Sequence, residues 1–319
     1  MPPDDDTIAT GSRRAQRARR RRIWQRSLIL GAVAALLVAG AAFAATGPLR
    51  DDVDGTESRA VTTSASAASG SESEPAHPCR SPLSPADPLR LWIGGDSLAG
   101  SLGPSLGGLA GKSGVVQPVF DARESSGLLS PEFVNWPKRG GEDMFTYNPE
   151  VAVFIVGAND AKTLQDGSER DADWRTRYSA LVEEMLVVLA GNGRVVYWVG
   201  APVMADPAYS ERVKAVNEVF RDVAARHPGV VYVDAYEAFS TADGSYAPTL
   251  PMPGGKISRV RGADGIHLTP EGGDLLATTV FDRLDPACRV TQQAVPGAAK
   301  QTIEAKGSSS VPGTRRERR

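Results

Sequence analysis

Cysteine and histidine are both scarce in this 319-residue chain, which contains two of the first and three of the second. No His-x-x-x-His pair, paired-cysteine spacing or EF-hand loop occurs, so the sequence implies no metal site. A glycine-rich segment at residues 107–113 includes a lysine, but a phosphate-binding loop in that register needs glycine where Leu106 stands. The segment follows a predicted helix and fits a glycine-capped helix end, so we expect no nucleotide and no other cofactor.

Long runs without charge are few, and the one at residues 27–45 has 19 residues. As a helix it would measure about 28 Å, close to the roughly 30 Å core of a bilayer. Eight arginines precede it and acidic residues follow it, which predicts a cytoplasmic N-terminus. We expect an uncleaved membrane anchor rather than a nucleic-acid-binding tail. Secretion after cleavage near Ala44 is the alternative, because Ala42-Phe43-Ala44 resembles a signal-peptidase site.

Composition divides the chain into five segments. We expect a basic cytoplasmic N-terminus (1–26), a transmembrane anchor or signal segment (27–45), a disordered linker (46–87), one folded domain (88–288) and a disordered tail (289–319). The linker and tail have too few large apolar residues to offset their ordering entropy. Cys79 and Cys288 bracket the folded domain. Because the compartment is oxidising and the ends of a domain often lie close together, we predict a disulfide; two free thiols are the alternative.

Apolar runs alternate with helical patterns through the folded domain. The predicted strands cover residues 89–93, 115–120, 151–156, 194–199 and 230–233, and the predicted helices begin at Ser97 or cover 174–189, 208–225 and 270–284. Strands that alternate with helices favour a single three-layer α/β/α domain with a parallel, flavodoxin-like sheet. Ligands of such sheets bind at the carboxyl ends of the strands.

One of these strand ends carries Gly94-Gly95-Asp96-Ser97-Leu98, a glycine turn that presents a serine at the start of a helix. A serine nucleophile needs a histidine base and a third group that orients the base. His77 and His227 lie in contexts that do not suit a base. His267 follows Asp264 by three residues, so the carboxylate can bind one ring nitrogen and leave the other for Ser97. The alternative is that Asp264 and His267 only cap a turn.

Two further strand ends supply candidate oxyanion donors. Asn159 follows the apolar run 151–156 and can direct its amide at a developing oxyanion, although an Asn-Asp turn is also common after strands. Gly127 follows the run 115–120 and offers a backbone N–H where no side chain blocks a substrate.

In this order and at these strand ends, the four motifs resemble the SGNH/GDSL hydrolase family. Its four blocks centre on Ser, Gly, Asn and His, which correspond to Ser97, Gly127, Asn159 and His267, and its Asp-x-x-His motif corresponds to Asp264. The resemblance covers roughly residues 88–286. It implies a catalytic triad of Ser97, Asp264 and His267, with an oxyanion hole formed by Ser97, Gly127 and Asn159. Residues near Trp136 and at 200–204 are similar to a membrane-anchored bacterial envelope subgroup.

These features together lead us to expect an extracytoplasmic serine esterase of the bacterial envelope. Arginine outnumbers lysine 29 to 7, which is typical of a GC-rich bacterial genome. The expected partners are the membrane, through residues 27–45, and an acylated carbohydrate or lipid, O-acetylated in the first instance. Three alternatives stay open at this point: an O-acyltransferase that uses the same acyl-enzyme, a non-catalytic binding module, and a glycosidase that uses Asp96, Asp160 or Asp264.

Overall fold

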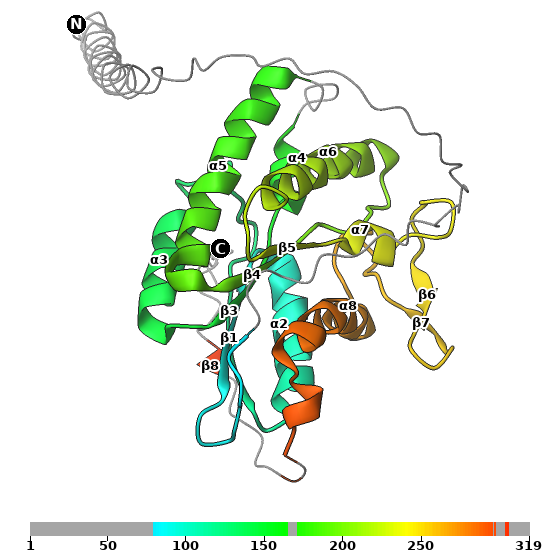
Figure 1. The fold of residues 1–319 in the computed structure, drawn as a ribbon. Helices are drawn as coiled ribbons and strands as arrows, with labels where there is room; N and C mark the ends of the chain where they lie inside the picture. The colour runs from blue at the N-terminus through cyan, green and yellow to red at the C-terminus, as the bar shows by residue number, and fades with distance from the viewer. Residues whose placement is uncertain (1–78, 165–170, 296, 298–303, 306–319) are drawn as a thin grey trace, which may run out of the picture. The chain divides into compact units, whose positions relative to one another are not determined.

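The computed structural model describes residues 79–164, 171–295, 297 and 304–305. A parallel β-sheet forms the centre of this part, with its strands in the order β5-β4-β3-β1-β2-β8 (Figure 1). The strands are β1 (Leu89–Gly95), β2 (Val116–Ala122), β3 (Val151–Ile155), β4 (Val195–Val199), β5 (Val230–Val233) and the two-residue β8 (Glu304–Ala305). Each adjacent pair is parallel, so the predicted α/β domain with a parallel sheet is confirmed.

Helices cover both faces of the sheet. They are α2 (Ser97–Gly111), α3 (Trp136–Tyr147), α4 (Ala158–Thr163), α5 (Ala172–Ala190), α6 (Pro207–Ala224), α7 (Ala235–Ala238) and α8 (Pro270–Cys288), with short 3-10 turns η3 (Gly191–Gly193) and η4 (Thr291–Gln293). Successive side chains of strand β4 point to opposite faces of the sheet. Tyr197 donates a hydrogen bond to α8 on one face, whereas Trp198 packs on Phe220 of α6 on the other. Helices α2 and α8 therefore form one outer layer, and α3, α5 and α6 form the other (Figure 1).

The sequence encodes where these helices begin. A side chain caps each of the five longest, accepting a hydrogen bond from a backbone N–H of the first turn; the caps are Asp96, Asn135, Asp171, Asp206 and Thr269. Such caps stabilise a helix by about 1 kcal/mol each. Helix α2 ends at Gly111, so the glycine-rich segment at 107–113 is a helix end, as predicted.

Aromatic side chains fill the layer between the sheet and helices α3, α5 and α6. Phe154 of β3 lies at the centre of this cluster, 5.1 Å from the Trp136 ring and 5.1 Å from the Trp198 ring. The predicted apolar face of α5 joins the cluster, with Tyr178 and Met185 fully buried. Residues of β3 are buried on both faces, which explains its unbroken apolar sequence.

The folded domain extends beyond the predicted bounds at both ends. Leu83 is buried in the core, and its backbone N–H donates to Gln293 Oε1 at 2.6 Å. Arg80 donates to Glu150 at 2.7 Å, and Val290 is fully buried. Residues 79–87 and 289–295 thus pack on the domain, which corrects the boundaries of the linker and the tail. Composition alone misses these segments because a few anchoring side chains hold each of them.

The predicted disulfide between Cys79 and Cys288 is present and closes a loop of 209 residues. A loop of this length corresponds to roughly 4–5 kcal/mol of chain entropy at most. The basic N-terminus, the predicted membrane segment at 27–45 and residues 46–78 of the linker lie outside the described residues and stay predictions. None of the helices that the structure does describe combines the length and the apolar character that a bilayer crossing requires.

A β-hairpin lies between α7 and α8, and the sequence patterns do not predict it. Its strands are β6 (Thr249–Pro251) and β7 (Ile257–Arg259), which pair antiparallel at the edge of the domain (Figure 1). The second strand leads directly into the loop that carries Asp264 and His267.

Candidate active site

Ser97 is the first residue of α2, and Asp96 alone separates it from the end of β1. The turn before it depends on glycine, because Gly95 has a φ of +146° and a Cβ there would lie 1.8 Å from the Ile155 carbonyl oxygen. Asp96 then caps α2 by accepting from the Leu98 N–H at 2.9 Å. The close approach of β1 and β3 and the capped helix together fix the position of Ser97.

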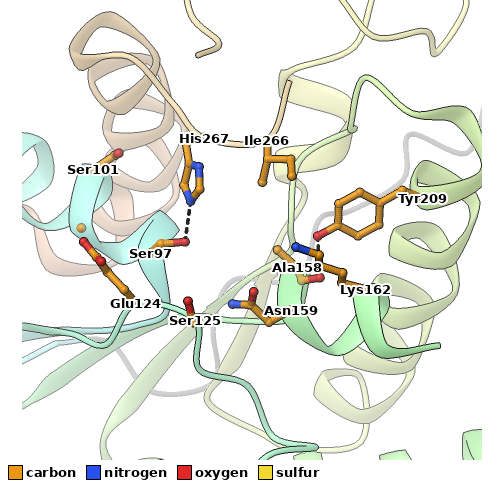
Figure 2. Close-up of a pocket in the computed structure, with 11 residues that line it drawn as sticks. Ser97, Ser101, Glu124, Ser125, Ala158, Asn159, Lys162, Tyr209, Ile266 and His267 are labelled. Carbon is orange, nitrogen blue, oxygen red and sulfur yellow. Dashed lines mark hydrogen bonds between the residues drawn. The ribbon is translucent and has the colours of Figure 1, made fainter. Parts of the chain in front are cut away.

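The loop before α8 brings the predicted base to this serine. His267 Nε2 lies 2.9 Å from Ser97 Oγ (Figure 2). On the other side of the ring, His267 Nδ1 lies 2.5 Å from Asp264 Oδ2. The other oxygen of Asp264 accepts from the backbone N–H groups of Ile266 and His267, at 2.9 and 3.0 Å. Asp264 therefore caps the turn and binds the imidazole at once, so the two alternatives from the sequence are compatible.

The protonation pattern of the pair follows from these contacts. The hydrogen bond from His267, with those from the backbone, holds the pKa of Asp264 well below its ordinary value. An ionised carboxylate only accepts, so it requires the ring proton on Nδ1. The Nε2 lone pair of His267 is then directed at the Ser97 hydroxyl, the arrangement that proton removal from a serine needs.

Three hydrogen-bond donors near the Ser97 hydroxyl are the predicted oxyanion donors. The Asn159 amide lines the cleft from the first turn of α4, and one of its hydrogens binds the Ser126 carbonyl at 2.8 Å. Neither the Ser97 nor the Gly127 backbone N–H reaches an acceptor among the described residues. Both N–H groups therefore lack a partner among the described residues, but Gly127 is buried and does not line the cleft.

The structure gives a different reason for glycine at position 127 from the one we expected. A Cβ at Gly127 would lie 2.2 Å from Asp160 Oδ1, so the missing side chain makes room for this buried carboxylate rather than for a substrate.

The cleft around Ser97 has a volume of about 550 Å³ and mostly polar walls. It is lined by Ser97, Gly100, Ser101, Glu124, Ser125, Ala158, Asn159, Lys162, Tyr209, Ile266 and His267. Figure 2 shows Glu124 and Lys162 on opposite sides of the catalytic candidates. Apart from the Tyr209 ring, Ala158 and Ile266 are the apolar side chains in the wall, so the cleft has no cluster of large aliphatic side chains.

Residues 90–283 match the model of a family described as "Protein of unknown function (DUF459)". The chain belongs to the DUF459 family. No curated protein matches it in sequence. The sheet order and the position of Ser97 after β1 make the DUF459 domain SGNH-hydrolase-like, as the motifs implied.

Solved structures similar to the DUF459 chain include several hydrolases. An acetylxylan esterase from Geobacillus stearothermophilus, solved as a catalytic mutant, is 14% identical over 61% of this chain and 94% of its own, with a TM-score of 0.47. An α/β hydrolase from the metagenome of Lake Arreo, Spain, is 19% identical over 61% and 94%, with a TM-score of 0.46. A GDSL-like lipase from Bacteroides thetaiotaomicron is 16% identical over 62% and 88%, with a TM-score of 0.43.

Asp160 shapes the site of the DUF459 domain, although the sequence reasoning gave it no part in the triad or the oxyanion hole. Its carboxylate accepts from the Leu128 and Leu129 N–H groups at 3.0 and 2.9 Å and from the Tyr178 hydroxyl at 2.7 Å. Burial raises the pKa of Asp160 despite these three bonds. Through its bonds to the Leu128 and Leu129 N–H groups, Asp160 holds the segment that follows Gly127. The one signal in the sequence was its place beside Asn159.

Asp96 is a second buried carboxylate next to the nucleophile. It has no exposed surface, and its Oδ2 has no hydrogen-bond partner among the described residues. Burial, with a smaller contribution from the charge of Asp160, raises the pKa of Asp96 to about 8. Neither Asp96 nor Asp160 lines the cleft, so neither is placed to reach a glycosidic bond. The geometry disfavours the glycosidase alternative.

Proposed function

We propose that this chain is a serine esterase that hydrolyses short O-acyl esters through a covalent Ser97 acyl-enzyme. The observation that supports it most directly is the continuous chain of contacts from Ser97 Oγ through His267 to Asp264. A hydroxyl, an imidazole and an ionised carboxylate in this order are what nucleophilic attack by a serine requires.

In the proposed mechanism Ser97 Oγ attacks the ester carbonyl while His267 Nε2 takes the hydroxyl proton. The C–O bond to the alcohol then breaks, and the imidazolium returns the proton to the leaving alkoxide. Water attacks the acyl-enzyme next, giving its proton to His267, and the carboxylic acid leaves as Ser97 recovers its hydrogen. Asp264 stabilises the imidazolium at both stages without taking its proton.

The tetrahedral intermediate in each stage carries a negative oxygen. We propose that the N–H groups of Ser97 and Gly127 and the second amide hydrogen of Asn159 bind it. Each such preorganised donor typically contributes 10²- to 10³-fold to the rate.

We propose acetyl or a similarly short acyl group on a polar alcohol, such as a glycan hydroxyl, as the substrate. The support is the lining of the cleft, in which Ile266 is the one large aliphatic side chain and most residues are polar. An envelope location, with the domain anchored through residues 27–45 outside the cytoplasmic membrane or released after cleavage near Ala44, is part of the proposal. It rests on the sequence of that segment and on the disulfide, which is typical of oxidising compartments.

Hydrolysis is preferred here to transfer of the acyl group to a sugar. About half of the His267 side-chain surface is exposed, so water has access to the base. A transferase needs to exclude water from the acyl-enzyme, and the open cleft does not favour this.

The test is incubation of the purified protein with p-nitrophenyl acetate, butyrate and octanoate, with and without a glycan acceptor, alongside Ser97→Ala. We expect hydrolysis that falls with acyl length, stoichiometric labelling of Ser97 by a fluorophosphonate, and loss of both in Ser97→Ala. Ester hydrolysis by Ser97→Ala at the wild-type rate, or labelling of another serine, would refute the proposal. A large gain in acyl transfer with the acceptor would favour the transferase instead.

A further inference from the structure

Arg261 is a fully buried arginine whose guanidinium binds three backbone carbonyls and, more weakly, the Met204 sulfur at 3.5 Å. Its Nη1 donates to the Val203 oxygen at 2.5 Å, and its Nη2 donates to the Gly265 and Ile266 oxygens at 3.2 and 2.8 Å. No carboxylate among the described residues forms an ion pair with it. A buried charge is costly unless something specific satisfies it, so this placement calls for an explanation.

The surroundings keep the guanidinium charged and in place. Its plane lies near two aromatic rings, 5.3 Å from the Tyr246 centroid and 5.8 Å from that of Phe239. Burial lowers the pKa of Arg261 to about 10, which still leaves the group protonated at neutral pH. Stacking against aromatic faces stabilises a desolvated guanidinium.

Two of the three carbonyls that Arg261 binds, those of Gly265 and Ile266, belong to the residues between Asp264 and His267. Both members of that pair are about half exposed, so packing of their own side chains does little to hold them. The loop also has three backbone hydrogen bonds: Gly262 N–H to the His267 carbonyl at 2.7 Å, Gly265 N–H to the Gly262 carbonyl at 3.2 Å, and Ala205 N–H to the Gly265 carbonyl at 3.1 Å. Arg261 joins this loop to Val203, in the segment that follows β4.

We infer that Arg261 is a positioning residue, which holds the backbone of the Asp264–His267 loop so that His267 meets Ser97 at hydrogen-bond distance. The inference rests on the proposed esterase function, because it assigns Arg261 a part in that reaction. It touches no substrate and acts through the two carbonyls. A displacement of about 1 Å in a catalytic group can reduce a rate by 10².

Arg194 supplies a matched control at the opposite end of the sheet. It is also buried, at 8% exposure, and it donates to the Pro149 and Gly191 carbonyls at 3.0 and 2.5 Å. Burial lowers the pKa of Arg194 as well. Arg194→Met therefore removes a comparable buried guanidinium far from the candidate triad.

The experiment compares Arg261→Met, Arg261→Lys and Arg194→Met with wild type in the full chain. We expect Arg261→Met to lower kcat for p-nitrophenyl acetate and the rate of Ser97 labelling by a fluorophosphonate by about 10- to 100-fold, with KM changed less than threefold. Arg261→Lys should recover part of this loss, since one ammonium keeps the charge but cannot reach all three carbonyls. Arg194→Met should lower the melting temperature similarly and leave both rates within twofold.

A second measurement separates failure of the inference from failure of the proposed function. The deshielded NMR signal of the His267 Nδ1 proton, identified by its loss in His267→Ala, should disappear or broaden in Arg261→Met and persist in Arg194→Met. If wild type hydrolyses no ester but the signal behaves in this way, the function is wrong and the positioning role holds. If wild type is active, and Arg261→Met and Arg261→Lys match Arg194→Met in rates and signal, the inference is overturned.

Discussion

Ser97 lies where a buried strand passes into a capped helix, whereas His267 and Asp264 lie on a loop that leaves about half of their side-chain surface exposed. The backbone before the nucleophile has no freedom, since the Ile155 carbonyl occupies the space where Gly95 would carry a Cβ. The histidine loop is held by hydrogen bonds, two of them from Arg261. Substitutions on the serine side should therefore cost stability, and those on the histidine side should cost activity first.

The largest effect should come from the histidine side. Asp264→Asn removes the charge that fixes the Nδ1 proton, so the imidazole can present N–H instead of a lone pair to Ser97. We expect kcat to fall by about 10⁴-fold, the usual cost of this change in a serine triad. The melting temperature should change little, because an asparagine oxygen can still accept from the Ile266 and His267 N–H groups.

The control for this prediction is Glu183→Gln, which disrupts the other histidine–carboxylate pair in the part of the chain that the structure describes, the pair with His227. That pair lies on the surface away from the cleft, so kcat for p-nitrophenyl acetate should not change. Equal losses of kcat in the two variants would contradict the prediction that the Asp264–His267 pair takes part in catalysis and the Glu183–His227 pair does not.

A stability loss should dominate on the serine side. Gly95→Ala places a methyl group against the Ile155 carbonyl at a φ that alanine rarely adopts, so we expect the free energy of unfolding to fall by more than about 3 kcal/mol. Gly108→Ala, in the last turn of α2 with open space around it, should instead raise it by about 0.5–1 kcal/mol. Urea unfolding measures both. A tolerated Gly95→Ala would show that the nucleophile turn is looser than its geometry indicates.

Asn159 belongs to neither side alone, because its amide donates to the Ser126 carbonyl and also lines the cleft. Asn159→Ala should reduce kcat by about 10²- to 10³-fold, the usual cost of one oxyanion donor. Asn217→Ala is the control, because that buried amide binds the Ala201 backbone away from the cleft. It should lower stability and spare kcat. Full activity in Asn159→Ala would exclude its amide from the mechanism.

Local sequence patterns predict the sheet and the residues that meet at its carboxyl edge. The apolar run 151–156 could be recognised as a strand because burial on both faces leaves an unbroken apolar sequence. Ser97, Asn159 and His267 could be placed together because each follows a predicted strand or opens a helix, and a parallel sheet brings such ends to one edge.

The parts that escaped prediction depend on partners distant in the chain. Asp160 binds backbone N–H groups about 30 residues earlier, and Arg261 binds a carbonyl 58 residues earlier. Backbone groups carry no sequence signature, so nothing in the residue pattern marks their partners. The hairpin β6–β7 was missed because its strands have three residues each and alternate too briefly to give a period.

The smallest predicted effect concerns the carboxylate beside the nucleophile. The raised pKa of Asp96, about 8 against an ordinary value of 3.8, means that the folded state keeps a proton that the unfolded chain has lost. Stability should therefore fall as pH rises between about 4 and 8, by about 2 kcal/mol from pH 6 to pH 8. Asp96→Asn keeps an oxygen for the Leu98 N–H and cannot ionise, so the difference between its stability and that of wild type should grow over this interval.

Urea unfolding at pH 6 and pH 8 tests this directly, with Asp206→Asn, the exposed cap of α6, as the control. Comparing each variant with wild type removes the contribution of every titratable group that the two proteins share. A constant difference between Asp96→Asn and wild type would mean that Asp96 is already ionised at pH 6. The orphaned Oδ2 would then be a buried negative charge beside Ser97, and the serine side would owe its rigidity to packing strong enough to offset that charge.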